Sequence, residues 1–252
     1  MTSRIELIGL DGIPEVAPGD DLAALVADAL AAADLRLTDE DVLVVTQKVV
    51  SKAEGRLVEL ASVEPSPFAR DWAARWDKDP RQVELVLRES ASIVRMGPGG
   101  LIIGRTRHGL VCANAGVDVS NVGGGEVASL LPEDPDRSAR RLREALRERT
   151  GAAAAVIISD SFGRPWRNGI VNVAIGSAGI EPLLDLRGEP DAAGREMRAT
   201  VIAVADELAS AADLAGGKVE GRPMVMVRGY DWRASEAGAS VLVMEAERDL
   251  FP

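Results

Sequence analysis

Three short, uninterrupted apolar runs constrain the fold of this 252-residue chain more than any other feature of its sequence. They are Val42–Val45, Ala153–Ile158 and Met224–Val227. A continuous apolar run of this length is typical of a β-strand covered on both faces, whereas a strand with one solvated face alternates apolar and polar residues. Segments with helical spacing separate the runs. The pattern therefore predicts an α/β fold with buried strands.

Helices are predicted where a side chain able to cap backbone N–H groups precedes an apolar stripe. Such starts occur at Ser66, Asp79 and Asp134. A further amphipathic helix is predicted from Leu22, with the acidic residues Asp20 and Asp21 at the positive end of its dipole. The helix after Asp134 should end at Gly151, because glycine readily adopts the left-handed conformation that terminates helices. A further, Ala-rich helix is predicted over Thr200–Leu214, ending at Gly216-Gly217.

An antiparallel meander is predicted in the middle of the chain. Its strands would be Ser92–Met96, Leu101–Ile103 and Leu110–Ala113, separated by turns rich in glycine. Repeats, linkers and low-complexity segments are not visible. We expect residues 1–252 to form a single domain, or two closely packed lobes.

Composition and charge exclude several classes of protein. Forty acidic and 29 basic side chains give a net charge of −11, which disfavours nucleic acid as a partner. No apolar run approaches the roughly 20 residues that span a bilayer, so no membrane contact is expected. Cys112 is the single cysteine, which excludes an internal disulfide, and no signal peptide is visible. We expect a cytoplasmic protein whose anionic ligands, if any, are held by local basic groups, backbone N–H groups or a cation.

Common catalytic and nucleotide-binding motifs are absent. His108 is the only histidine and no Gly-x-Ser-x-Gly occurs, so a serine-hydrolase triad has little support, and a hydrogen-bonding role for His108 is favoured. The chain has no phosphate-binding loop of the Gly-x-x-x-x-Gly-Lys-Ser/Thr type. Gly97–Gly100 lacks the spacing of a dinucleotide-binding fingerprint.

Three polar segments directly follow predicted apolar strands and are candidates for a catalytic or ligand-binding site. In 114–121, Asp118 stands among small and amide residues, and a tight loop is the simpler interpretation. In 159–167, Asp160 and Ser161 offer hard oxygen ligands for Mg²⁺ or Mn²⁺, with Arg164 and Arg167 suited to phosphate or carboxylate. The alternative is a capped turn with surface arginines. The basic cluster in 46–56 would alone be read as a solvated turn.

Together these segments resemble the coenzyme F420-0:gamma-glutamyl ligase family. The similarity runs from about Ile5 to the C-terminus and follows the order of the motifs in the family. It includes Gly12–Glu15, Gly19–Leu22, Lys48–Arg56, His108–Asn121, Asp160–Arg167 and Asp185–Gly188. The blocks around Asp118 and Asp160 are the most specific.

The resemblance implies an unusual α/β fold that forms an intertwined homodimer, with GTP as phosphoryl donor. It also implies two divalent cations, Mg²⁺ or Mn²⁺, with a monovalent cation such as K⁺ as an optional addition. Asp118 and Asp160 match metal ligands, and Ser161 matches a position at the second metal. Residues that match nucleotide contacts are Ile13, Pro14, Glu15, Val16, Gln47, Lys52, Asn121, Gly216, Gly217, Lys218, Val219, Glu220 and Gly221. Near this last loop the chain is one residue shorter and carries Lys218 close to a position that is often glutamine.

The reaction implied is addition of L-glutamate to coenzyme F420-0 through an acyl phosphate, with Asp118, Asp160, Arg164 and Arg167 at the reacting groups. Two rival hypotheses stay open at this point. One is a non-catalytic module that binds GTP or the coenzyme, and the other is a metal-dependent phosphohydrolase. Because the chain ends just after the ligase-like region, no fused nitroreductase-like domain is expected.

Overall fold

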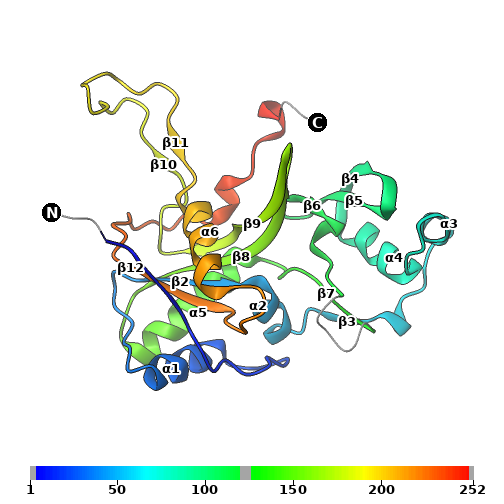
Figure 1. The fold of residues 1–252 in the computed structure, drawn as a ribbon, viewed down its shortest axis with the longest axis horizontal. Coiled ribbons are helices and arrows are strands. Elements are labelled where there is room, and N and C mark those ends of the chain that lie inside the picture. The colour runs from blue at the N-terminus through cyan, green and yellow to red at the C-terminus, as the bar shows by residue number, and fades with distance from the viewer. Residues whose placement is uncertain (1–3, 120–125, 250–252) are drawn as a thin grey trace.

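A five-stranded mixed sheet forms the centre of the protein, seen in a computed structural model that describes residues 4–119 and 126–249 (Figure 1). In spatial order its strands are β1 (Glu6–Gly9), β12 (Met224–Arg228), β2 (Val42–Thr46), β8 (Ala155–Arg164) and β9 (Arg167–Ala178). β2 and β8 are parallel, and every other neighbouring pair in this sheet is antiparallel. The three apolar runs are therefore three adjacent strands at the centre of the sheet.

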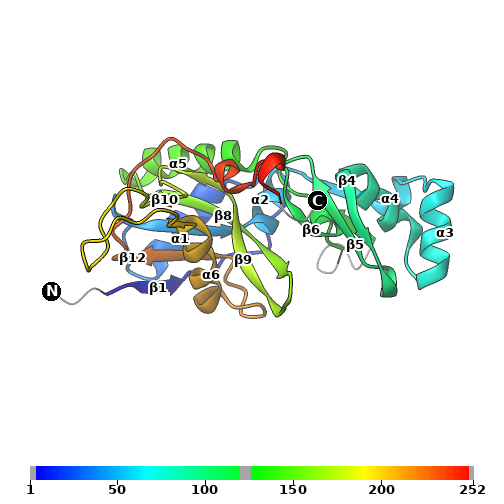
Figure 2. The ribbon, with the colours of Figure 1, turned by 90° about the horizontal axis from the view of Figure 1, so that it is seen from above.

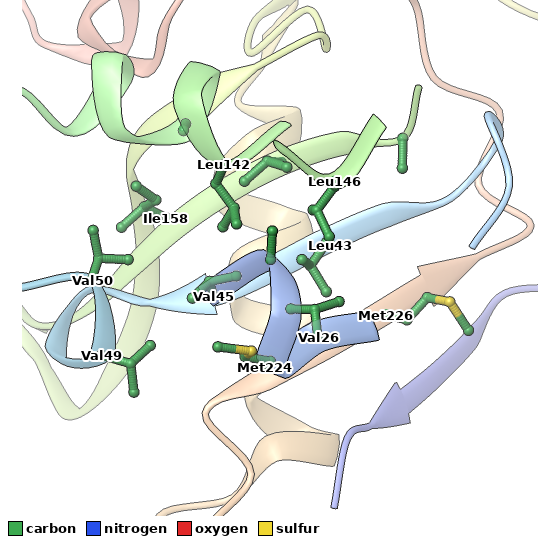
Figure 3. Packing of buried hydrophobic residues seen from close by; sticks show 14 of the residues in the cluster. Val26, Leu43, Val45, Val49, Val50, Leu142, Leu146, Ile158, Met224 and Met226 are labelled. Carbon is green, nitrogen blue, oxygen red and sulfur yellow. The ribbon is translucent and has the colours of Figure 1, made fainter. Parts of the chain in front are cut away.

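Helices cover both faces of this sheet. Helices α1 (Leu22–Ala32) and α5 (Pro135–Thr150) pack on one face, and α6 (Val204–Gly216) packs on the other (Figure 1). Leu43 and Val45 of β2 lie in the same cluster as residues of α1 and α5, whereas Val42 and Val44 lie with α6. Figure 3 shows the first of these clusters. The predicted burial of β2 on both faces is confirmed.

A smaller group of elements lies at one end of the sheet in both views (Figures 1 and 2). It contains α3 (Pro67–Trp76), α4 (Pro80–Glu89) and the antiparallel meander β4 (Ser90–Met96), β5 (Ile102–Thr106) and β6 (Val111–Ala113). These elements share their own hydrophobic cluster, centred on residues such as Leu60 and Ile102. The remaining elements are α2 (Gln47–Ala53), the pair β3 (Leu57–Glu59) and β7 (Val127–Ser129), and the arm formed by β10 (Leu184–Asp185) and β11 (Val201–Ile202).

The predicted helix starts are confirmed by capping hydrogen bonds. Side chains of Asp21, Ser66, Asp79 and Asp134 each accept a bond from a backbone N–H in the first turn. Gly151, at φ 78°, terminates α5 in the left-handed conformation as expected. Along 4–119 and 126–249, none of the helices is long and apolar enough to cross a bilayer.

The two largest differences between predicted and observed boundaries arise where a segment pairs with another strand. The strand expected over 153–158 begins at Ala155 and continues to Arg164, because 159–164 pairs with β9 in a long hairpin. The helix expected from Thr200 begins at Val204, because Val201 and Ile202 pair with β10 instead. In each case pairing with a distant segment extends a strand through residues whose local pattern indicates something else.

A buried ion pair joins two neighbouring strands of the central sheet. Asp41, fully buried, accepts hydrogen bonds from Arg228 Nε at 2.8 Å and Nη2 at 2.7 Å, and from Thr38 N at 2.8 Å. Burial raises the pKa of Asp41, but the hydrogen bonds from Arg228 and Thr38 outweigh it and hold the pKa below its usual 3.8. The pair therefore stabilises the fold above pH 3.8, and this contribution is lost as the pH falls through the lowered pKa.

We accordingly expect Asp41→Asn to lower the free energy of unfolding by about 2 kcal/mol at pH 7, because it leaves Arg228 without its carboxylate. The deficit should shrink below pH 4. Urea denaturation at pH 7 and at pH 3.5 measures both values. Asp28→Asn, at an exposed position on α1, is the matched control and should change stability by less than about 0.5 kcal/mol.

Candidate active site

The sheet topology brings three chain segments to one edge. Because β2 and β8 are parallel and in register at Thr46 and Ser159, the residues that follow both strands meet there. β12 runs antiparallel to β2 with Met224 opposite Val45, so the loop that enters β12 reaches the same edge. Ligands of open α/β sheets commonly bind at the carboxyl ends of parallel strands.

A cavity of about 580 Å³ lies at this edge. It is lined by Ile13, Pro14, Glu15, Val16, Thr46, Gln47, Lys48, Val49, Lys52, Ala113, Gly116, Val117, Asp118, Ser159, Asp160, Ser161, Asn172, Asp213, Gly217, Lys218, Gly221, Arg222 and Pro223. Among these described residues, four side chains are basic and four are acidic. In a chain with a net charge of −11, the cavity is thus a locally balanced region suited to an anionic ligand accompanied by a cation.

Asp160 lies on β8 at the floor of the cavity. The pKa of its carboxyl group is raised to about 6, chiefly by burial and also by the nearby charge of Asp118. The Ser161 backbone N–H at 2.8 Å, a hydrogen bond with Gln47 and the charge of Lys218 act in the opposite direction. A buried carboxylate that is held this close to a second one is stabilised in its ionised form by a cation.

Asp118 reaches the cavity from the smaller group of elements. The preceding residues Asn114, Ala115 and Gly116 all have positive φ, which turns the chain sharply after β6. A Cβ at position 116 would lie 2.6 Å from Leu131 Cγ, so this position requires glycine. An isolated bridge to Ser129 then holds Asp118, and its carboxylate forms an ion pair with Lys48 Nζ at 2.5 Å.

Lys52 is the most buried ammonium group of the cavity wall. Its side chain is 8% exposed, and it forms an ion pair with Glu15, whose side chain is 82% exposed. A buried cation with a solvent-exposed partner can exchange that partner for a ligand anion at little cost, because Glu15 is readily solvated elsewhere. The geometry therefore suits contact between Lys52 and a phosphate.

A second polar network forms the opposite wall. Ser161 Oγ donates to Asn172 Oδ1 at 2.7 Å, and Asn172 Nδ2 donates to Asp213 Oδ1 at 3.1 Å. Lys218 Nζ donates to Ser161 Oγ and lies 3.4 Å from Asn172 Oδ1 and 3.6 Å from Asp213 Oδ1. Residues from β8, β9, α6 and the loop after α6 are thus joined around one ammonium group.

The donor set fits one divalent cation and disfavours a second. No three Asp, Glu, His or Cys side chains of the described residues come together as a ready metal site. Mg²⁺ is nevertheless commonly held by one or two carboxylates, with waters and substrate phosphates as its other ligands, and Asp118 with Asp160 fits that type. Lys48 contacts Asp118 as Lys218 contacts Ser161, but a carboxylate has about four lone-pair sites, whereas the Ser161 hydroxyl has only two and also donates its proton to Asn172 Oδ1.

Most residues expected at the site line the cavity. Gly216, Val219 and Glu220 belong to the loop that supplies Gly217, Lys218 and Gly221 but do not line the cavity themselves. Arg164 and Arg167 lie at the tip of the β8–β9 hairpin, outside it, and Arg164 Nη2 donates to the backbone oxygen of Asn168 at 2.6 Å. Asn121 lies outside the described residues. The roles predicted for these residues stay predictions.

Asn172, Asp213 and Arg222 also line the cavity and were not predicted from the sequence to belong to a site. One signal was available for Asp213. It lies near the C-terminus of α6, where the helix dipole disfavours a carboxylate, so a specific partner was to be expected. Asn172 is a buried amide in an otherwise apolar stretch of β9. Polar residues at such positions commonly belong to a hydrogen-bond network.

Cys112 and His108 do not line the cavity. Burial raises the pKa of Cys112 to about 12, and the charge of Asp160 adds to the effect, so the thiolate is disfavoured. His108 is away from the cavity lining, and its Nε2 lies 3.1 Å from the backbone oxygen of Glu133. The hydrogen-bonding role predicted for His108 is confirmed.

Comparison with known proteins gives consistent results over almost the whole chain. A sequence model of the family described as F420-0:Gamma-glutamyl ligase matches residues 12–229. Coenzyme F420:L-glutamate ligase of Methanopyrus kandleri is 53% identical over 255 residues, covering 99% of this chain and 98% of the relative. The enzyme of the same name from Methanothermobacter thermautotrophicus is 48% identical over 250 residues, covering 98% of each chain. That from Methanocaldococcus jannaschii is 39% identical.

Proposed function

From the premise that this chain belongs to the F420-0:gamma-glutamyl ligase family, we propose that it joins L-glutamate to coenzyme F420-0 with GTP as the phosphoryl donor. The relatives carry the name of a ligase of this coenzyme, and they cover nearly the full length of the chain. The chain is accordingly a ligase of coenzyme F420 biosynthesis. GTP, the intermediate and the roles of individual residues are the finer parts of the proposal.

The observation that supports these finer parts is the cavity at the sheet edge. It gathers two carboxylates suited to a cation, Asp118 and Asp160, with a buried ammonium group on Lys52 that can exchange its partner. A ligase of this type must hold two anions, a triphosphate and a carboxylate, within reach of each other. Such a reaction depends mainly on positioning and charge stabilisation, and a covalent protein nucleophile is not required.

The proposed reaction has two steps. The terminal carboxylate of F420-0 attacks the γ-phosphorus of GTP, so a C–O–P bond forms, the bond to the β-phosphate oxygen breaks, and GDP leaves. The α-amino group of glutamate then attacks the acyl carbon, and inorganic phosphate leaves as the amide forms. The amino group loses its protons to phosphate or water.

Each wall of the cavity has a part in this scheme. Asp118 and Asp160 would hold a divalent cation, which when bound screens the charge of the phosphates. Lys52 of α2, released from Glu15, binds phosphate oxygens. The segment 13–16 contributes backbone and side chains to the nucleotide, in keeping with its place in the cavity lining.

A single assay tests the proposal against its rivals. The protein is incubated with GTP, Mg²⁺ or Mn²⁺, F420-0 and glutamate, with and without K⁺, and the products are identified by mass. Ligation gives F420 species heavier by glutamate, together with GDP and phosphate. GTP hydrolysis that is independent of F420-0 and glutamate would instead identify a phosphohydrolase, and binding without turnover would identify a non-catalytic module.

We propose that Arg164 and Arg167, at the tip of the β8–β9 hairpin, contact the distal part of the coenzyme. Arg164 lies three residues beyond Ser161 on β8, which at about 3.3 Å per residue is roughly 10 Å from the cavity floor. F420-0 carries a phosphodiester some way from its reacting carboxylate. Within the described part of the chain, no ion pair or side-chain hydrogen bond occupies Arg167.

We therefore expect Arg167→Ala to raise KM for F420-0 at least tenfold, equivalent to about 1.4 kcal/mol, with KM for GTP unchanged within twofold. Arg167→Lys should recover only part of this loss, because lysine cannot make a bidentate contact. Steady-state kinetics with each substrate varied in turn measures the effect. Arg140→Ala on the exposed side of α5 is the matched control, and equal KM values for Arg167→Ala and this control would remove Arg167 from the site.

We also propose that the chain acts as a homodimer. The support in the structure is the apolar surface of the β8–β9 hairpin, where Trp166 is 83% exposed and Ile170 is 56% exposed. Light scattering after size exclusion would give twice the 26.6 kDa of one chain. Elution as a monomer at micromolar concentration would contradict this part.

A further inference from the structure

The Lys218 ammonium group occupies a place built for a cation. Three oxygen atoms surround it, Ser161 Oγ, Asn172 Oδ1 and Asp213 Oδ1, and each comes from a different strand or helix. Asn172 is 4% exposed, so this part of the oxygen cluster around the ammonium group is buried in the protein. The ammonium group donates hydrogen bonds to Ser161 and, at 3.4 Å, to Asn172, and the Asp213 carboxylate at 3.6 Å adds the attraction of an opposite charge.

The direction of each hydrogen bond in the network is fixed by its neighbours. Ser161 Oγ donates its only proton to Asn172 Oδ1, so its lone pairs are turned towards Lys218. Asn172 donates its amide N–H to Asp213, so its carbonyl oxygen is also turned towards Lys218. The carboxylate of Asp213 supplies the negative charge. All three oxygens thus present electron pairs to one point.

A divalent cation cannot share these oxygens with the ammonium group. The lone pairs of Ser161 that would coordinate a metal already accept from Lys218, and a second positive charge a few ångströms away would be repelled. The carboxylates of Asp118 and Asp160 also line the cavity and keep their place for one cation. The described residues therefore offer one site for a divalent cation, at Asp118 and Asp160. The Lys218 ammonium group occupies the second position, at Ser161, Asn172 and Asp213.

We propose that the Lys218 ammonium replaces the second divalent cation, so that this chain uses one divalent cation and one built-in monovalent charge. The proposal rests on the proposed function for its setting, because it concerns the cations that accompany the nucleotide. Its physical basis is local. Asp213 and Asn172 position Lys218, and Lys218 then faces the cavity as a fixed positive charge that needs no metal from solution.

Counting bound Mn²⁺ tests the proposal without reference to turnover. The full-length protein is saturated with a non-hydrolysable GTP analogue, and bound Mn²⁺ per chain is measured by electron paramagnetic resonance. We expect one Mn²⁺ per chain and no magnetic coupling. In Lys218→Gln, which removes the charge and keeps an oxygen, a second Mn²⁺ should bind at least tenfold more tightly than to the wild type. The pair should be coupled, since two-metal sites are spaced about 3.5–4 Å apart.

Lys78→Gln is the matched control, because Lys78 is exposed and lies outside the cavity. It should bind one Mn²⁺ like the wild type, and circular dichroism should show that both variants are folded. Two coupled Mn²⁺ ions in the wild type, or one in both the wild type and Lys218→Gln, would overturn the proposal. A failure of the proposed function would show separately, as absence of glutamylated product in the mass assay whatever the Mn²⁺ count.

Discussion

Asp160→Asn is expected to lower kcat/KM for ligation at least a thousandfold, equivalent to about 4.1 kcal/mol, while making the metal-free protein more stable. The loss of activity follows because asparagine has no charge with which to hold a divalent cation. The rest of the site should remain in place, since asparagine can still accept the Ser161 backbone hydrogen bond. Steady-state kinetics at saturating and at limiting Mn²⁺ measures the effect.

The gain in stability follows from the raised pKa of Asp160. Burial places it at about 6 in the folded state, above the ordinary value of 3.8. The stabilising contribution of the neutral acid is complete below pH 3.8 and is lost as the pH rises through 6. At pH 7.5 the wild type should therefore be less stable than Asp160→Asn by on the order of 1 kcal/mol, a value reduced because the carboxylate opens to the cavity. Urea denaturation in the presence of a chelator measures this difference.

Asp206→Asn is the matched control for both effects. Burial raises the pKa of Asp206 as well, and its Oδ1 accepts the Ala174 backbone N–H at 2.8 Å, but it does not line the cavity. Its stability should change in the same direction, with kcat/KM within threefold of the wild type. Near-normal ligation by Asp160→Asn at limiting Mn²⁺ would show that this carboxylate is not a cation ligand.

Lys52→Ala should weaken binding of a non-hydrolysable GTP analogue about a hundredfold, equivalent to about 2.7 kcal/mol. The size follows from the loss of a buried charge-assisted hydrogen bond to phosphate, which is among the strongest single contacts a side chain makes. Binding of Mn²⁺ should change much less, because an ammonium group does not coordinate a metal. Isothermal titration calorimetry measures both affinities.

Glu15→Gln tests whether Glu15 itself contributes to nucleotide binding or only pairs with Lys52 when no nucleotide is bound. If Glu15 only holds the place of a ligand anion, removing its charge should leave the affinity for the nucleotide unchanged or increase it by a few fold. Lys78→Ala, in the other group of elements, should behave as the wild type. An unchanged affinity in Lys52→Ala would return Lys52 to a structural role, as the partner of Glu15 alone.

The parts of the fold that could be predicted are those determined by local interactions. A cap such as Ser66 contacts a backbone N–H only three residues ahead. The burial of β2 can be predicted from its own residues, because they form an uninterrupted apolar run. The second half of β8 has neither property. Its residues 159–164 are strand only because β9 pairs with them, and their partners lie up to 15 positions away, as Ala174 does from Ser159.

The site was predictable only to the extent that a family resemblance supplied it. Asp118 and Asp160 come from separate strands, and no spacing in the sequence states that they meet. The parallel register of Thr46 with Ser159 explains why the segments after β2 and β8 share one edge. Asn172 and Asp213 were not predicted because they act through a hydrogen bond to each other, and this bond joins β9 to α6 across 41 residues of sequence.

The equal number of acidic and basic side chains around the cavity has a consequence for how fast a substrate arrives. A triphosphate approaching from solution first meets a body with a net charge of −11, and only at the cavity mouth does it meet balanced charge. Salt screens the distant repulsion first, since the Debye length is about 8 Å at physiological ionic strength, and affects buried contacts far less. Moderate salt should therefore speed the encounter while leaving the lifetime of the complex to short-range contacts, the reverse of the behaviour of a basic nucleotide-binding protein.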